Sequence, residues 1–273
     1  MEKLLYFETH VQADNNQWIL LVHGAGGSIK TWKRQVDQLG AAYNLLIIDL
    51  PGHGKSAKLC EDVPVYSFEF VADKIWEVVD HLNISSIHLV GISLGTIICL
   101  QMRVLKPQKV LSVIMPGAIV QLNFKLRTLA NMSLALAKVI GYPNFYKLSA
   151  YVMMPRGNHK KSRDVFVQES KALTLEEFKK WTDLYYHLND TLKVLFYKTS
   201  TLPHILIMGN QDHLFLGPAK AYNEQHDNAN ISIVKNCGHV VSIEKAAQFN
   251  SICLDFLNQL KAPKPNQDLS LLC

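Results

Sequence analysis

The sequence predicts an α/β fold, in which a mostly parallel central sheet is flanked by helices and carries an inserted helical segment. Two observations predict the sheet: short apolar runs recur along the chain, and amphipathic stretches of helical period separate them. A third observation predicts the insertion, because no apolar run of this kind occurs between residues 118 and 202.

The predicted strands are short, mostly apolar runs. Continuous runs of this length are typical of strands that are covered on both faces, as in a parallel sheet. They comprise residues 18–22, 43–49, 86–90, 110–115, 204–208 and 231–234.

The predicted helices lie between these runs, at residues 30–39, 67–82, 94–105 and 246–260. Ser67 is a suitable N-cap for the second of them. The third stops before Lys106-Pro107, since the residue before a proline disfavours the helical conformation. This alternation of strands and helices indicates right-handed crossover connections.

The insertion and the termini divide the chain into four predicted parts. Residues 1–117 form the first part of the core, 118–202 a helical cap, 203–261 the second part of the core, and 262–273 a frayed tail. The cap is rich in aromatic residues and methionine, and its basic run at 159–163 is expected to be a solvated loop.

Composition restricts the class of protein. The chain has 273 residues, of which 48% are hydrophobic and 19% charged, so a disordered or collagen-like protein is excluded. A net charge of +5 is weak for this length and does not favour a nucleic-acid partner.

The cysteines and the apolar stretches indicate a cytoplasmic protein. The five cysteines include no C-x-x-C pair, so we expect reduced thiols and no metal site. The N-terminus lacks the apolar run of a signal peptide, and no apolar stretch is long enough to span a membrane. We therefore expect no stable membrane anchor.

One motif carries nucleophilic chemistry. Residues 91–95 read GISLG, a G-x-S-x-G pattern between a predicted strand and a predicted helix. In that setting the pattern is typical of a sharp turn that exposes a serine nucleophile, here Ser93. The alternative is an ordinary glycine-rich loop, which the strand and helix on either side make less favoured.

A serine hydroxyl needs a base and an acid to become a nucleophile. His239 follows the last predicted strand and is the candidate base, with His213 as its main rival. Asp212 follows the strand at 204–208 and is the candidate acid, since residues 116–118 after the preceding strand contain no carboxylate. The chain order Ser93, Asp212, His239 is the order found on hydrolase sheets.

Two glycine-rich stretches imitate phosphate-binding loops. Gly24, Gly26 and Gly27 would need a further glycine at Ile29 to form a dinucleotide-binding turn. Residues 54–56 would need another glycine at the position of Asp49 to form a P-loop. We therefore expect no cofactor.

Taken together, the motifs resemble those of the α/β-hydrolase superfamily, in its capped serine hydrolase, esterase-like group. The resemblance covers residues 4–260 and rests on HGAGGS at 23–28, DLPGHGKS at 49–56, GISLG at 91–95 and GH-x4-E at 238–244. It implies an oxyanion hole made by the backbone N–H groups of Ala25 and Leu94. Only about 17 residues precede the first run, so a first antiparallel edge strand is expected to be missing.

The resemblance implies a serine hydrolase that cleaves an ester-like bond through an acyl-enzyme. An apolar cap favours a small hydrophobic ester or lactone as the substrate, and the candidate substrate contacts are the adjacent pairs Phe145-Tyr146 and Met153-Met154. These four residues have the alternative role of packing the cap onto itself. Lactonase, thioesterase, carbon–carbon hydrolase and cofactor-free haloperoxidase chemistry remain open, as does a ligand receptor or signalling protein with slow turnover. The sequence carries no signal for an oligomeric state.

Overall fold

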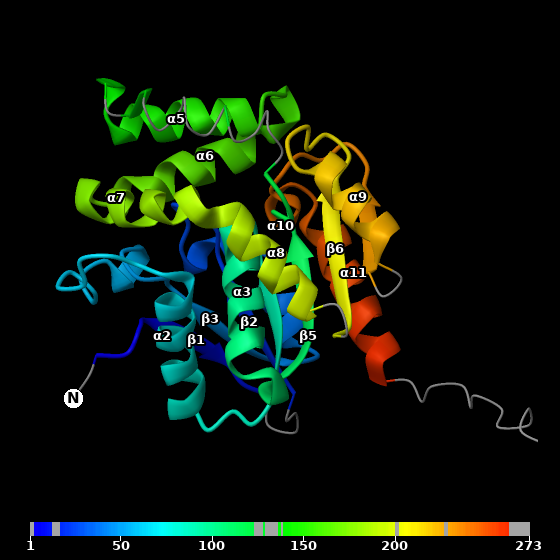
Figure 1. The fold of residues 1–273 in the computed structure, drawn as a ribbon. Helices are drawn as coiled ribbons and strands as arrows, with labels where there is room; N and C mark the ends of the chain where they lie inside the picture. The colour runs from blue at the N-terminus through cyan, green and yellow to red at the C-terminus, as the bar shows by residue number, and fades with distance from the viewer. Residues whose placement is uncertain are drawn as a thin grey trace, which may run out of the picture.

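The computed structural model describes residues 3–12, 17–122, 128, 136–137, 139–199, 202–226 and 229–261. Their centre is a seven-stranded sheet with the order β1-β3-β2-β4-β5-β6-β7 (Figure 1). Strand β1 pairs antiparallel with β3, and all other neighbours are parallel. The strands are β1 (Phe7–His10), β2 (Trp18–Val22), β3 (Asn44–Ile48), β4 (Ile87–Gly91), β5 (Val110–Pro116), β6 (His204–Gly209) and β7 (Ala229–Val234). The predicted fold class is confirmed.

The six predicted strands all form, with ends that differ by two residues at most from the prediction. The expectation that an antiparallel edge strand would be missing is wrong, because β1 occupies that place. Its residues, Phe7–His10, are half-buried or exposed, so this strand shows none of the continuous apolar character by which the others were predicted.

The helices cover both faces of the sheet (Figure 1). Ser67 caps α2 (Phe68–His81) as predicted, since its hydroxyl accepts the N–H of Phe70 at 3.0 Å. The helix predicted at 30–39 is instead two short pieces, η1 (Ile29–Trp32) and α1 (Val36–Gly40). The other helices outside the insertion are α3 (Leu94–Leu105), α9 (Leu216–Gln225), α10 (Val241–Glu244) and α11 (Ala246–Lys261), with the short turns η2 (Gly54–Ser56) and η3 (Pro107–Lys109).

Alternate residues of each inner strand enter two separate apolar cores. In β2, Leu20 and Val22 belong to the core under α2 and α3, whereas Ile19 and Leu21 belong to the core under α1 and α11. This division follows from the two-residue period of a strand. Because β2 to β7 are parallel, their carboxyl ends lie together at one end of the sheet. Ligands of such folds bind at that end.

Above that end of the sheet lies the inserted segment (Figure 1). Its described part is helical between residues 139 and 199: α5 (Tyr142–Met153), η4 (Gly157–His159), α6 (Lys160–Glu169), η5 (Ser170–Ala172), α7 (Leu175–Asp183), η6 (Leu184–His187) and α8 (Leu188–Thr199). The basic run at 159–163 is not a solvated loop as expected. Lys160 begins α6, and His159, which precedes it, is fully buried because its ring contacts the side chain of Gln211 from a core loop.

Three smaller expectations concern the chain as a whole. The four described cysteines, Cys60, Cys99, Cys237 and Cys253, are free thiols. None of the described helices is long and apolar enough to cross a membrane. The predicted tail at 262–273 lies outside the described residues.

Candidate active site

Ser93 occupies a tight turn between β4 and α3. Its φ angle is +55°, a strained value for a residue with a side chain. Glycines make the turn fit: a Cβ on Gly95 would lie 2.5 Å from the carbonyl oxygen of Val22, and one on Gly91 would overlap the Gly95 carbonyl. The close approach of strand and helix therefore requires glycine on both sides, and it presents Ser93 to the space above the sheet.

Asp212 and His239 come from the loops after β6 and β7. The Nδ1 atom of His239 lies 2.8 Å from Oδ2 of Asp212, and both side chains are almost fully buried. The other oxygen, Oδ1, accepts the N–H of Phe215 at 3.1 Å. Burial raises the pKa of Asp212, but His239 and the N–H groups of Phe215 and Leu214 outweigh it and lower the pKa below its ordinary value. Asp212 is therefore an anion at neutral pH.

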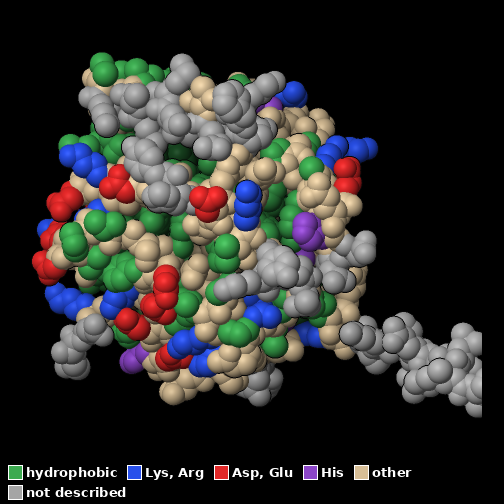
Figure 2. Space-filling model, in the orientation of Figure 1, with side chains coloured by type: hydrophobic (Ala, Val, Ile, Leu, Met, Phe, Trp, Pro, Cys, Tyr) green, Lys and Arg blue, Asp and Glu red, His purple; other side chains and the backbone are tan. Residues whose placement is uncertain are grey.

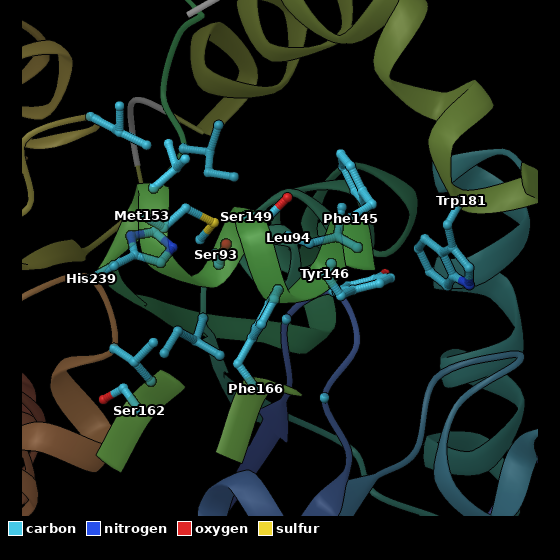
Figure 3. A pocket seen from close by; sticks show the side chains of 18 of the residues that line it. Ser93, Leu94, Phe145, Tyr146, Ser149, Met153, Ser162, Phe166, Trp181 and His239 are labelled. Carbon is cyan, nitrogen blue, oxygen red and sulfur yellow. The ribbon is translucent and has the colours of Figure 1, made fainter. Parts of the chain in front are cut away.

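The second ring nitrogen of His239 is available. Among the described residues, Nε2 of His239 is buried and has no hydrogen-bond partner. Figure 3 shows this ring beside Ser93, and both residues line the same cavity. The rival histidine, His213, is exposed and lies outside that cavity lining. The structure thus brings together the three residues predicted from the sequence order.

The loop that carries Ala25 is held by two buried, neutral histidines. Burial lowers the pKa of His23 to about 4 and that of His53 to about 3. Nε2 of His53 therefore accepts the N–H of Gly26 at 3.0 Å, and Nε2 of His23 accepts the N–H of Leu50 at 3.1 Å. This fixes the loop, and Ala25 lines the cavity together with Leu94 at the start of α3.

A cavity of about 770 Å³ lies between the sheet edge and the inserted helices. Ser93 and His239 lie at one end, and Trp181 of α7 at the other (Figure 3). Three of the four predicted contacts, Phe145, Tyr146 and Met153, line it.

Met154 does not line the cavity. Its side chain is fully buried, and it follows the last residue of α5, Met153, which does line the cavity. The prediction of a substrate contact at Met154 is therefore wrong.

Several residues that line the cavity were not predicted from the sequence. Phe178, Trp181 and Tyr185 recur at intervals of three and four residues from α7 onward and line the cavity together. That helical period is a signal which could have found them. Phe166 of α6 was likewise missed; its ring packs at a tilt against that of Tyr146, with the ring centroids 5.4 Å apart.

The inserted helices are anchored to the core by buried polar contacts. Glu177 and Lys180 of α7 pair at 2.8 Å, and both are almost fully buried. Tyr66 donates to Glu177 at 2.5 Å, and the indole N–H of Trp181 donates to the Pro51 carbonyl at 3.0 Å. These bonds fix α7 as one wall of the cavity.

A second buried polar group connects α6 to the loops of the candidate acid and base. Glu244 accepts the N–H of Gly238 at 2.6 Å and the hydroxyl of Ser162 at 3.0 Å. His159 contacts the side chain of Gln211 at 2.8 Å. The residues next to Asp212 and His239 are therefore tied to the insertion. Within the described part of the chain, no group of three or more His, Cys, Asp and Glu side chains could hold a metal ion.

Comparison with known proteins agrees with this architecture. One relative is the dihydrolipoyllysine-residue acetyltransferase component of the acetoin cleaving system of Pseudomonas putida, which is 26% identical over 260 residues. The match covers 88% of this chain but only 63% of that protein.

Two solved structures resemble the fold closely. The esterase EaEST of Exiguobacterium antarcticum has a TM-score of 0.78 at 16% identity, covering 94% of this chain and 96% of that one. The bromoperoxidase of Bacillus anthracis has a TM-score of 0.79 at 18% identity, covering 93% and 95%. The model of the alpha/beta hydrolase fold family matches residues 17–246. The chain belongs to the alpha/beta hydrolase fold family.

Proposed function

We propose that this protein is a serine hydrolase that cleaves an ester-like bond of a small hydrophobic substrate through an acyl-enzyme intermediate. One observation carries the proposal. His239 is buried, is oriented by the anionic Asp212, and keeps its Nε2 free in the cavity that Ser93 lines. An imidazole held in this way is the base that a serine hydroxyl requires.

The proposed reaction has two halves. In the first, Nε2 of His239 takes the proton of Ser93 as Oγ attacks the carbonyl carbon, and the oxyanion is bound by the N–H groups of Ala25 and Leu94. The proton then passes to the leaving alcohol, and the acyl group stays on Ser93. In the second half, His239 activates a water that cleaves the acyl-enzyme and returns the proton to Ser93.

The cavity supports a hydrophobic substrate. Its walls are mainly aromatic and aliphatic, and its volume is that of a pocket for a small organic molecule. We propose that residues 118–202 act as a cap over the core formed by 1–117 and 203–261. In this proposal Phe145, Tyr146 and Met153 contact the substrate, whereas the core residues perform the chemistry.

The test is turnover of a panel of p-nitrophenyl esters and lactones of graded chain length. We expect multiple turnovers in the wild type and a loss on the order of 10⁶ in rate for Ser93→Ala, with an unchanged melting temperature. Activity near the wild-type level in Ser93→Ala would refute the proposal. A single turnover per chain would instead favour a ligand receptor that modifies its ligand once.

A further inference from the structure

The cavity opens to solvent between apolar side chains. Four of its lining residues are themselves exposed: Leu136 (39%), Val139 (83%), Leu148 (43%) and Val152 (36%). We call these four residues the mouth. An opening bordered by exposed aliphatic side chains costs solubility, and such patches generally mark a contact site.

The exposed apolar surface continues beyond the mouth. Tyr151 of α5 is 53% exposed and neighbours Val152. Figure 2 shows hydrophobic side chains along the upper edge of the molecule, where Figure 1 places α5. Among the described helices of the insertion, α5 lies farthest from the sheet in Figure 1, so its exposed side chains can meet a large flat partner.

Most of the net charge of the chain lies in the same segment. Residues 139–164 contain five basic residues and one acidic residue, a net charge of +4, and the whole chain has a net charge of +5. The basic residues are Lys147, Arg156, Lys160, Lys161 and Arg163.

Part of this charge is free to contact a partner. Lys160 pairs with Asp164 at 2.6 Å, and Arg163 lies 4.8 Å from the ring of Tyr151. Lys147 and Lys161 are exposed, and no ion pair is formed by either within the described residues. Two unpaired cations therefore lie on the same segment as the exposed apolar side chains.

We propose that this face of α5 and α6 docks on an anionic lipid surface, so that the mouth opens toward the lipid. Exposed aliphatic and aromatic groups enter the interfacial region of a bilayer, and lysines beside them bind anionic headgroups. A hydrophobic ester would then reach Ser93 from the lipid phase, which rests on the proposed function. The positive charge of residues 139–164 favours an anionic lipid surface over an apolar protein partner. Anionic headgroups would pair with the exposed lysines, whereas an apolar protein surface offers them no negative charge.

Co-sedimentation of the full chain with vesicles tests the inference. The vesicles contain phosphatidylcholine alone, or phosphatidylcholine with about one-third phosphatidylglycerol. We expect binding to the anionic vesicles, weakened by salt, and little binding to the neutral ones. Lys147→Gln/Lys161→Gln should weaken the binding by about 30-fold, because two surface cations are lost.

The matched control makes the same charge change at the other edge of the sheet. Lys106 and Lys109 precede β5 and pair with Asp80, far from the carboxyl ends of the strands. Lys106→Gln/Lys109→Gln should bind anionic vesicles like the wild type. Val139→Asp, which puts a charge into the mouth, should also weaken binding.

Each outcome decides the matter. Equal loss in the two lysine double variants, binding that ignores lipid charge, or no binding at all overturns the docking proposal. Turnover of water-soluble p-nitrophenyl acetate without vesicles should be the same for wild type and Lys147→Gln/Lys161→Gln. Loss of docking with that turnover intact would leave the proposed hydrolase standing, whereas an active Ser93→Ala would refute the hydrolase without affecting vesicle binding.

Discussion

Asp212→Asn is expected to inactivate the protein by reversing the tautomer of His239. The carboxylate accepts the N–H of Phe215 at 3.1 Å through Oδ1, and it contacts Nδ1 of His239 at 2.8 Å through Oδ2. An asparagine has one oxygen, which the backbone N–H at Phe215 holds in place. The amide NH₂ then faces Nδ1 of His239, which must accept, so Nε2 carries the proton and cannot take one from Ser93.

The expected loss in kcat is about 10⁴-fold, or about 5.5 kcal/mol of transition-state stabilisation. The assay is kcat for p-nitrophenyl butyrate at neutral pH, with the melting temperature measured in parallel. The substitution keeps the shape of the side chain and the hydrogen bond from the N–H of Phe215, so the fold should persist. A loss of less than tenfold in a folded Asp212→Asn variant would show that the reasoning about Asp212 is wrong.

Three further predictions test the loops, the cavity and the turn. His53 has a folded-state pKa of about 3, below its unfolded value of about 6.5, so its contribution to stability is lost as pH falls through that interval. His53→Gln should make the unfolding free energy from urea titrations less dependent on pH, by about 1.4 kcal/mol per unit between pH 6 and 4; equal slopes would contradict a buried neutral His53. Met153→Gln should change the chain-length preference in kcat/KM with little change in melting temperature, whereas Met154→Gln should lower the melting temperature by several degrees without changing the preference, since only Met153 lines the cavity. The same change in chain-length preference and melting temperature in both variants would contradict the assignment of Met153 alone to the cavity. Gly95→Ala should reduce both stability and ester turnover, because its Cβ would lie 2.5 Å from the Val22 carbonyl oxygen; a variant as stable as the wild type in thermal melts would show that the turn relaxes freely.

The fold was predictable because the buried strands are continuous apolar runs. In β3, β4 and β6 every residue is buried, and each was found from sequence to within one residue at either end. Strand β1 was not found, because it lies at the edge of the sheet and none of its residues is fully buried. Its sequence therefore lacks the continuous apolar run by which the inner strands were predicted.

The candidate site was predictable where chain order restricts geometry. The carboxyl ends of parallel strands meet at one edge, so residues that follow β4, β6 and β7 had to come close. Chain order alone does not choose between His213 and His239, because both follow Asp212; the structure decides, since it places His213 at the surface and His239 in the cavity lining.

Side-chain orientation in the insertion was not predictable. Met153 and Met154 are adjacent and chemically identical, yet one lines the cavity and the other is buried elsewhere. The difference depends on where α5 ends and on which helices pack against it, which are tertiary facts. The burial of His159 depends in the same way on its contact with Gln211 from a core loop.

The most direct test of the proposed chemistry is covalent labelling of Ser93. The wild type is incubated with a fluorophosphonate, which reacts with activated serines, and the site of the adduct is determined by peptide mass spectrometry. We predict one adduct, on Ser93, which Asp212→Asn and His239→Ala suppress. Labelling at a different serine, or no labelling of a preparation that hydrolyses esters, would contradict the account.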